Sequence, residues 1–260
     1  MRTRLGVTSA MTLRKRLPLS LPAPHPVHAP AGQRYIFPGI AARTLRLKEI
    51  PFPAQLHILV ALQRQLEHSG FIFVRNWHPK LCRMQGWDCA ERVELHILVR
   101  CLNEEFRTVL AVSGRNSAPD AFHPLCKELV GIRHAAVHRR PQQRRDLFRK
   151  FAVAAEFTAD WLGDRASSRQ IQLCRFRLES LVDGFHASRC RLQVHVAARI
   201  GQYHARDPDR QAQQQRLREA ARRINQQYTH HFVAQVEQVL SESFRCLSSW
   251  RPGRDSPPRL

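Results

Sequence analysis

The fold is decided by residues 171–203, which read IQLCRFRLESLVDGFHASRCRLQVHVAARIGQY. Apolar side chains recur in this stretch every three or four residues, a spacing that places them on one face of an α-helix. The positions in this register are Ile171, Cys174, Leu178, Leu181, Phe185, Leu192, Val196, Ile200 and Tyr203. Ser167 or Ser168 is expected to cap the start of the helix.

The same period returns after Asp207 and Pro208, which combine a capping residue with a proline at the first helical position. Its apolar positions are Leu217, Ala221, Ile224, Tyr228, Phe232, Val236, Leu240 and Phe244. Two helices of about 40 residues with a short connection predict an antiparallel hairpin roughly 55–60 Å long. Its outer faces are rich in Arg and Gln, so residues 165–247 are a candidate surface for a protein partner.

A first helix is indicated upstream, where apolar residues from Leu56 to Leu66 lie on one face and Ser69-Gly70 marks the expected end. The aromatic and β-branched stretch Phe71–Trp77 is interpreted as an extended connector.

Further helices are expected over residues 89–112 and 122–140, and Pro141 has the geometry to open the next helix at its first turn. The apolar face of that next helix is Leu147, Phe151, Ala155, Thr158 and Leu162. No strand pattern appears in the body of the chain. The sequence therefore predicts an all-α fold in which a helical bundle precedes the long C-terminal hairpin.

Residues 1–50 are interpreted as a disordered, basic, proline-rich tail. The prolines that prevent a continuing helix are Pro18, Pro22, Pro24, Pro26 and Pro30. The predicted organisation is a tail over residues 1–50, a bundle over 51–162, a hairpin over 163–250 and a disordered tail over 251–260.

The expected compartment is intracellular and reducing, because the seven cysteines are odd in number and form no Cys-x-x-Cys pair. Three interpretations of the N-terminal residues remain open. The Arg-rich, acid-free first 16 residues are typical of a mitochondrial transit peptide, Arg14-Lys15-Arg16 is a minimal nuclear-type cluster, and an untargeted tail is the third. No apolar run approaches the roughly 20 residues that a membrane span requires.

The chain carries a formal net charge of +21, and 37 of its 42 basic residues are Arg. Residues 1–48 hold nine basic and no acidic residues and residues 251–260 contribute +2, which leaves +10 for residues 49–250. Such a charge attracts polyanions, and the planar guanidinium suits phosphate. The alternative explanation of the Arg excess is the codon usage of a GC-rich genome.

One short stretch suggests chemistry, the hexapeptide Arg133-His134-Ala135-Ala136-Val137-His138. An imidazole accepts or donates a proton near neutral pH, as cleavage of RNA by its 2′-hydroxyl requires. A neighbouring guanidinium can hold the phosphate and offset the charge that develops on its oxygens. On a helix, His134 and His138 share a face.

This hexapeptide resembles the signature of the HEPN superfamily, all-α proteins many of which are metal-independent endoribonucleases. In that signature an Arg is followed by a polar residue and, a few residues later, by a His. The resemblance implies catalytic roles for Arg133, His134 and His138 in a reaction that needs no metal or other cofactor. It also implies a homodimer in which two motifs face each other. The expected RNA-binding residues are Arg139, Arg140, Arg144, Arg145, Arg149 and Lys150.

The stretch from Trp87 to Leu95, together with residues 133–139, is also similar to segments of a group of uncharacterised fungal proteins. These proteins share an acidic helix and an Ala-Val-His-Arg block. The group brings no activity, so this resemblance indicates a recurring structural unit.

Other functions are compatible with the same residues. Ala135, Ala136 and Val137 can equally be core residues of a helix, with the histidines in solvent and Arg133 paired with an acid such as Glu128. The protein would then be a non-catalytic scaffold that uses its hairpin. The pairs His134–His138 and His186–Cys190 have metal-ligand spacing but no acidic third ligand, so no metal site is expected. ATP-driven chemistry and serine hydrolysis are disfavoured, because no Gly-rich phosphate loop or Gly-x-Ser-x-Gly motif occurs.

Overall fold

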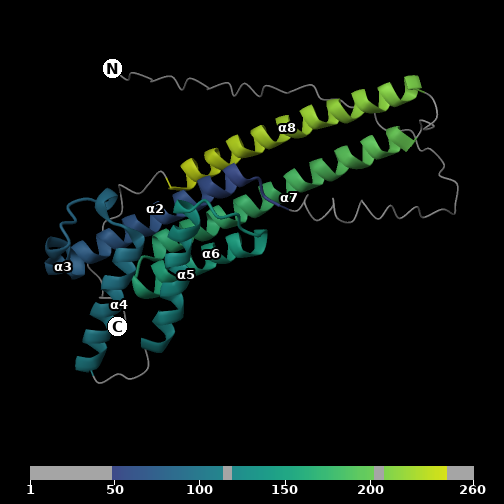
Figure 1. Ribbon diagram of the computed structural model, residues 1–260. Helices are drawn as coiled ribbons and strands as arrows, with labels where there is room; N and C mark the ends of the chain where they lie inside the picture. The colour runs from purple at the N-terminus through teal and green to yellow at the C-terminus, as the bar shows by residue number, and fades with distance from the viewer. Residues whose placement is uncertain (1–48, 114–118, 202–207, 245–260) are drawn as a thin grey trace, which may run out of the picture. The chain divides into compact units, whose positions relative to one another are not determined.

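The computed structural model describes residues 49–113, 119–201 and 208–244 (Figure 1), which belong to one compact unit. The regular elements in these ranges are helices, so the predicted all-α fold is confirmed. The helices are α2 (Phe52–Trp77), α3 (Pro79–Met84), α4 (Leu95–Ser113), α5 (Pro119–Val137), α6 (Arg144–Glu156), α7 (Arg165–Gly201) and α8 (Pro208–Phe244). A 3₁₀ turn, η1 (Ala90–Arg92), precedes α4, and a π-helical segment, η2 (Phe157–Trp161), continues α6.

The predicted hairpin is formed by α7 and α8, which run antiparallel along each other (Figure 1). The Phe185 and Phe232 rings stack with their centroids 4.3 Å apart. Near the start of α7 and the end of α8, Arg177 donates a hydrogen bond of 2.5 Å to Glu242. Pro208, the proline predicted to open the second helix, is its first residue.

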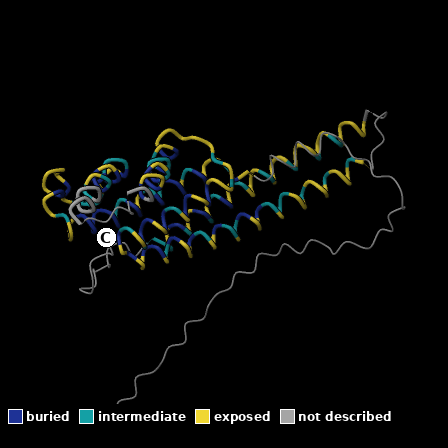
Figure 2. The backbone as a smooth tube through the Cα atoms, turned by 90° about the horizontal axis from the view of Figure 1, so that it is seen from below, coloured by how far each residue is buried: buried dark blue, intermediate teal, exposed yellow. Residues whose placement is uncertain are grey.

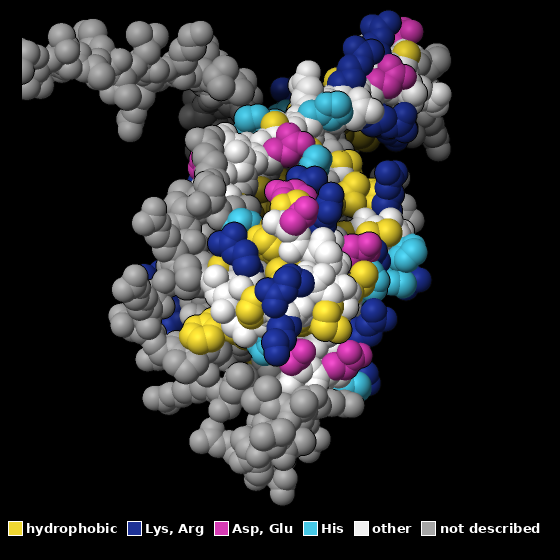
Figure 3. Space-filling view, turned by 90° about the vertical axis from the view of Figure 1, so that its left-hand side faces the viewer, with side chains coloured by type: hydrophobic (Ala, Val, Ile, Leu, Met, Phe, Trp, Pro, Cys, Tyr) yellow, Lys and Arg dark blue, Asp and Glu magenta, His cyan; other side chains and the backbone are white. Residues whose placement is uncertain are grey.

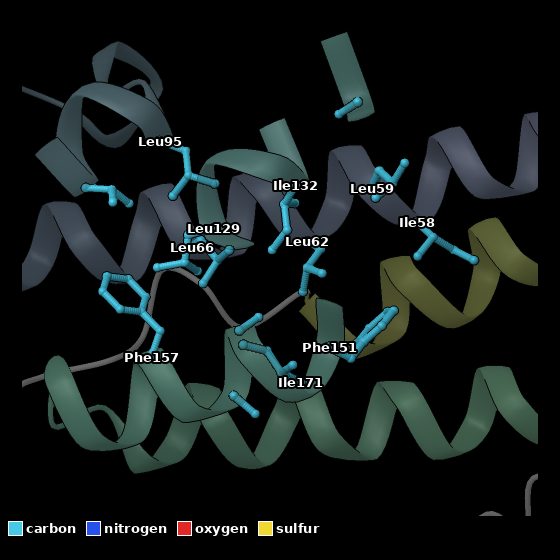
Figure 4. Close-up of a cluster of buried hydrophobic side chains, with 14 of the residues drawn as sticks. Ile58, Leu59, Leu62, Leu66, Leu95, Leu129, Ile132, Phe151, Phe157 and Ile171 are labelled. Carbon is cyan, nitrogen blue, oxygen red and sulfur yellow. The ribbon is translucent and has the colours of Figure 1, made fainter. Parts of the chain in front are cut away.

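The core lies where α2 and α6 pack against the inner half of this hairpin and α5 packs against α2 and α6. Figure 4 shows Leu62 and Leu66 of α2 directed toward Leu129 and Ile132 of α5, with Phe151, Phe157 and Ile171 completing the cluster. All of these side chains are buried. Burial then declines along the hairpin: the last buried residue of α7 is Phe185, and the outer half of both helices is exposed or half-buried (Figure 2).

The extended connector predicted at Phe71–Trp77 is wrong, because α2 continues through it to Trp77. Gly70, expected to end the helix, is instead a site of close helix contact. A Cβ atom there would lie 2.2 Å from Cδ2 of Leu98, a buried side chain of α4. Gly70 is therefore required by packing rather than by a turn.

Helix starts also differ from expectation. Neither Ser167 nor Ser168 caps α7; Asp164 does, because its Oδ1 accepts a 2.9 Å hydrogen bond from the Ser167 amide. Pro141 does not open α6, which begins three residues later at Arg144.

Two further boundaries move. The helix expected from residue 89 starts only at Leu95, after the short 3₁₀ turn. The helix expected over residues 122–140 spans Pro119–Val137.

The N-terminal tail predicted over residues 1–50 lies outside the described residues except for its last two. Of those two, Ile50 is buried, and its carbonyl oxygen accepts a 2.8 Å hydrogen bond from Gln55. The folded body therefore begins before residue 51. Within the described ranges, no helix is both long and apolar enough to cross a membrane.

Candidate functional site

The hexapeptide identified in the sequence forms the C-terminal end of α5. The helix ends because Arg139 adopts a left-handed conformation, with φ of 50°. The amide of Arg140 then donates a 3.1 Å hydrogen bond back to the carbonyl of Ala135. This is the pattern of a Schellman cap, in which glycine usually takes the left-handed position. The cap turns the chain sharply and leaves the side chains of His138, Arg139 and Arg140 exposed.

His134 and His138 form a contacting pair on this helix end, with ring centroids 4.2 Å apart and planes inclined by 52°. Both residues are exposed. Desolvation lowers the pKa of His134 from its usual value, and the nearby His138, Arg140 and Arg133 lower it further. His134 is therefore biased toward the neutral imidazole, the form that accepts a proton. We call the residues His134, His138, Arg139 and Arg140 the α5-end surface.

Arg133 does not join the two histidines. Its guanidinium donates a hydrogen bond to Oε2 of Glu94, the residue before α4. This ion pair lies beside Glu67, whose Oε1 accepts hydrogen bonds from Gln63 (2.8 Å) and from the Leu95 amide (2.9 Å). Burial raises the pKa of Glu67, whereas those two donors and the charge of Arg133 lower it. Arg133 thus joins α5 to the start of α4.

The chain after α5 is fixed to α2. The Gln142 amide donates a 2.7 Å hydrogen bond to Oε1 of Gln55, a buried residue whose Nε2 in turn bonds to Ile50. The side-chain nitrogen of Gln142 also donates to the carbonyls of Arg140 and Pro141. The polar anchor Gln55 holds the loop that carries Arg139 and Arg140 in place.

The six residues expected to bind RNA have different environments. Arg144 pairs with Asp183 at 2.7 Å, and Arg149 pairs with Glu128 at 2.7 Å. Lys150 is only 8% exposed, and burial lowers its pKa. The other three, Arg139, Arg140 and Arg145, are exposed and form no ion pair with any described residue. Only this second group is accessible to an external anion without breaking an existing ion pair.

Basic charge alone does not mark the site. On the face seen in Figure 3, Lys and Arg side chains lie dispersed among Asp, Glu and His side chains. The α5-end surface differs because its exposed cations, which form no ion pair within the described part of the chain, adjoin a contacting pair of imidazoles.

Several features of the alternative, structural interpretation of the hexapeptide also hold. Ala135 and Ala136 are buried, as core residues of a helix would be, whereas Val137 is 52% exposed. Arg133 does pair with an acid, but the acid is Glu94 and not Glu128. The sequence does not identify Glu94 as the partner of Arg133, because 39 residues separate the two. The sequence does hold a signal for Gln55, because this polar residue lies three and four residues before Ile58 and Leu59 and so shares the apolar face of their helix.

The described part of the chain shows neither a cluster of metal-ligating side chains nor a reactive thiol at Cys174. No group of three or more His, Cys, Asp or Glu side chains there is arranged to hold a metal ion. Burial raises the pKa of the Cys174 thiol to about 11, which keeps it protonated and unreactive. The spacing of Arg133 and His138 recurs at Arg199 and His204, and this second histidine lies outside the described residues.

Comparison with known proteins gives no match: no protein-family model, no curated protein and no solved structure is significantly similar to this chain.

Proposed function

We propose that this protein binds RNA through its phosphates at the α5-end surface. The observation that carries the proposal is the presence, at one helix end, of two exposed imidazoles beside two exposed arginines that form no ion pair with any described residue. Because Arg binds phosphate oxygens in a bidentate manner, Arg139 and Arg140 suit a phosphodiester. Arg145, exposed in the first turn of α6, adds a third cation to the chain just beyond them.

Cations at the end of a helix also offset its dipole, so their presence alone does not require a ligand. Two details favour a ligand here. The carbonyls of His134 and Ala135 already accept hydrogen bonds from the amides of His138 and Arg140, so the guanidinium groups are not needed to satisfy them. Moreover, an arginine occupies a left-handed position that costs a non-glycine residue conformational energy.

A second candidate function, RNA cleavage, is favoured by the histidine pair. The neutral form of His134 would accept the proton of a ribose 2′-hydroxyl while the 2′-oxygen forms a bond to phosphorus. Protonated His138 would donate its proton to the departing 5′-oxygen as the old phosphorus–oxygen bond breaks. The products are a 2′,3′-cyclic phosphate and a 5′-hydroxyl, and no metal ion takes part.

In this scheme Arg133 acts on His134 through its charge, and its guanidinium stays on Glu94. The resemblance to HEPN proteins adds the proposal that two copies of the chain bring two α5-end surfaces together. A protein partner of the hairpin would bind elsewhere, along α7 and α8.

The binding proposal is tested by a filter-binding titration of single-stranded RNA. The double variant Arg139→Gln/Arg140→Gln is compared with Arg216→Gln/Arg218→Gln on α8, which removes the same charge elsewhere. We expect the first pair to weaken binding at least tenfold and the second to have under a threefold effect. Equal effects would show that attraction is spread over the whole basic surface, and would refute the α5-end surface as the site.

Cleavage is tested with fluorogenic RNA in the presence of EDTA. His134→Ala and His138→Ala should each reduce the rate about 10²–10⁴-fold, the usual effect of removing a proton-transfer group. His230→Ala, which removes an exposed imidazole from α8, is the matched control. Cleavage that persists in the first two variants, or that EDTA abolishes, would exclude this mechanism and leave binding alone.

A further inference from the structure

The outer half of the hairpin, residues 186–201 of α7 and 209–231 of α8, carries an apolar seam that is incompletely covered. Figures 1 and 2 both show these helix ends extending beyond α2 and α6. The apolar residues that line the seam are Leu192, Val196, Ile200, Leu217, Ala221, Ile224 and Tyr228. Each is half-buried or exposed, and Ile224 and Tyr228 are 37% and 38% exposed.

The seam continues the core register without the core's covering helices. Phe185 and Phe232 are its last buried pair, at 7% and 2% exposed. Beyond them the apolar spacing persists for about 16 residues on each helix, or about 24 Å at 1.5 Å per residue. Packing of the two helices against each other leaves Ile224 and Tyr228 more than a third exposed, and a third helix laid along the seam would cover them. The pattern therefore has the length and period of a docking site for a helix.

The charge around the seam restricts what can dock there. Residues 186–201 contain three Arg and no acid, and residues 209–231 contain five Arg against Asp209 and Glu219, so the region carries a net charge of +6. Arg216, Arg218, Arg222 and Arg223 form no ion pair with any described residue. A ligand that neutralises them must bring its own carboxylates or phosphates.

Two occupants from the chain itself are disfavoured by this charge. A second copy of the hairpin would bring the same +6 into contact with the first. Residues 1–48, which contain nine basic and no acidic residues, would also be repelled.

We infer that the outer hairpin docks an acidic amphipathic helix of a partner protein. Apolar residues of the partner, spaced three and four apart, fill the seam between α7 and α8, and Glu or Asp residues on both sides of that stripe pair with the flanking arginines. The product is a local three-helix bundle. RNA binding at the α5-end surface is not needed for this interaction.

The test uses the full chain and a synthetic amphipathic peptide of about 21 residues, three heptads with Leu at the two core positions and Glu at the flanking positions. The control peptide has Lys in place of Glu. Fluorescence anisotropy should show the Glu peptide binding at least tenfold more tightly than the Lys peptide. Equal binding of both peptides would overturn the inference. So would failure of the full chain to bind the Glu peptide, the result expected if another segment of the chain fills the seam.

Variants locate the contact. Ile224→Gln/Tyr228→Gln removes apolar surface at exposed positions without a change of charge, and should weaken peptide binding at least tenfold. Val194→Gln, at a 71% exposed residue off the seam, should leave binding within twofold. Arg218→Gln/Arg222→Gln provides a second, electrostatic test that does not depend on folding of the first variant. If the seam variants weakened the binding of RNA but left the affinity for the Glu peptide unchanged, the seam would be an RNA-binding surface and the inference would fail.

Discussion

Arg133 is bound through its guanidinium to the carboxylate of Glu94, 39 residues earlier in the chain. Because of this contact, the arginine of the hexapeptide is a link between α4 and α5, and the side chains free to meet a phosphate are those that follow it. The arginines therefore have two separate roles. Arg133 positions the helix end and lowers the pKa of His134 through its charge, whereas Arg139 and Arg140 are the residues that we propose bind phosphate.

The first prediction concerns that charge. Arg133→Gln should raise the pKa of His134, because a positive charge that now disfavours the imidazolium is removed. A general base works in its neutral form, so the acidic limb of any pH–rate profile should move to higher pH. Histidine proton shifts followed by NMR measure the change. Arg92→Gln, which breaks the exposed pair with Asp88, is the control, and an unchanged His134 titration in Arg133→Gln would contradict the electrostatic role.

Replacing Arg139 by glycine should separate stability from function. Its φ of 50° suits glycine and strains arginine, so Arg139→Gly is expected to stabilise the fold by about 0.5–1 kcal/mol. The same variant should weaken RNA binding, because it removes a guanidinium that the proposed function places on a phosphate. Chemical denaturation and a binding titration are the two measurements. A stabilised variant with unchanged RNA affinity would show that this arginine serves no ligand.

The buried charge of Lys150 is expected to lower the free energy of unfolding of the wild-type protein and to have no effect on its affinity for RNA. Burial lowers its pKa, so the folded state holds this proton less tightly than the unfolded chain does. Wild-type stability should therefore rise as the pH increases from the lowered pKa toward the ordinary value near 10.5. Lys150→Met should remove that pH dependence and raise stability by about 1 kcal/mol, as thermal melts at several pH values will show. A fall in both stability and RNA affinity would instead restore Lys150 to the binding surface.

Two glycines in long helices should respond in opposite ways to alanine. At Gly70 the new Cβ would collide with the buried Leu98, and Gly70→Ala should cost about 1–3 kcal/mol. At Gly184 nothing lies within 4 Å, so Gly184→Ala should stabilise α7 by about 0.5–1 kcal/mol. Denaturation midpoints measure both effects. Similar effects at the two sites would mean that α2 and α4 do not approach each other as described.

The hairpin is the most predictable part of the fold, because the apolar period runs through 37 residues in each helix. This period is visible in the sequence of each helix alone, without knowledge of what the helix packs against. Gly70 shows why the bundle is harder to predict. A glycine after a serine is a normal helix stop, and only the position of Leu98 reveals that this one permits close packing. The capping role of Asp164 is hidden because two serines nearby have equally suitable side chains.

Less of the candidate site is visible in the sequence. The proximity of His134 and His138 follows from helical spacing, and the contact of their rings confirms it. Which arginines are accessible does not follow, because Asp183 and Glu128 pair with Arg144 and Arg149 across different elements. The burial of Lys150 is equally hidden, since a basic run shows neither which side chains face the core nor how a helix ends.

The salt dependence of RNA binding tests the central claim most directly. For single-stranded RNA, log Kobs decreases linearly with log salt concentration, and the steepness of this decrease is reduced by about 0.7 for each phosphate that a variant no longer neutralises. We predict that Arg139→Gln/Arg140→Gln, which removes two phosphate contacts, makes the slope less steep than that of the wild type by about 1.4. Arg216→Gln/Arg218→Gln should leave the slope unchanged. No binding of the wild type at about 50 mM salt, or the same slope in wild type and Arg139→Gln/Arg140→Gln, would contradict the claim.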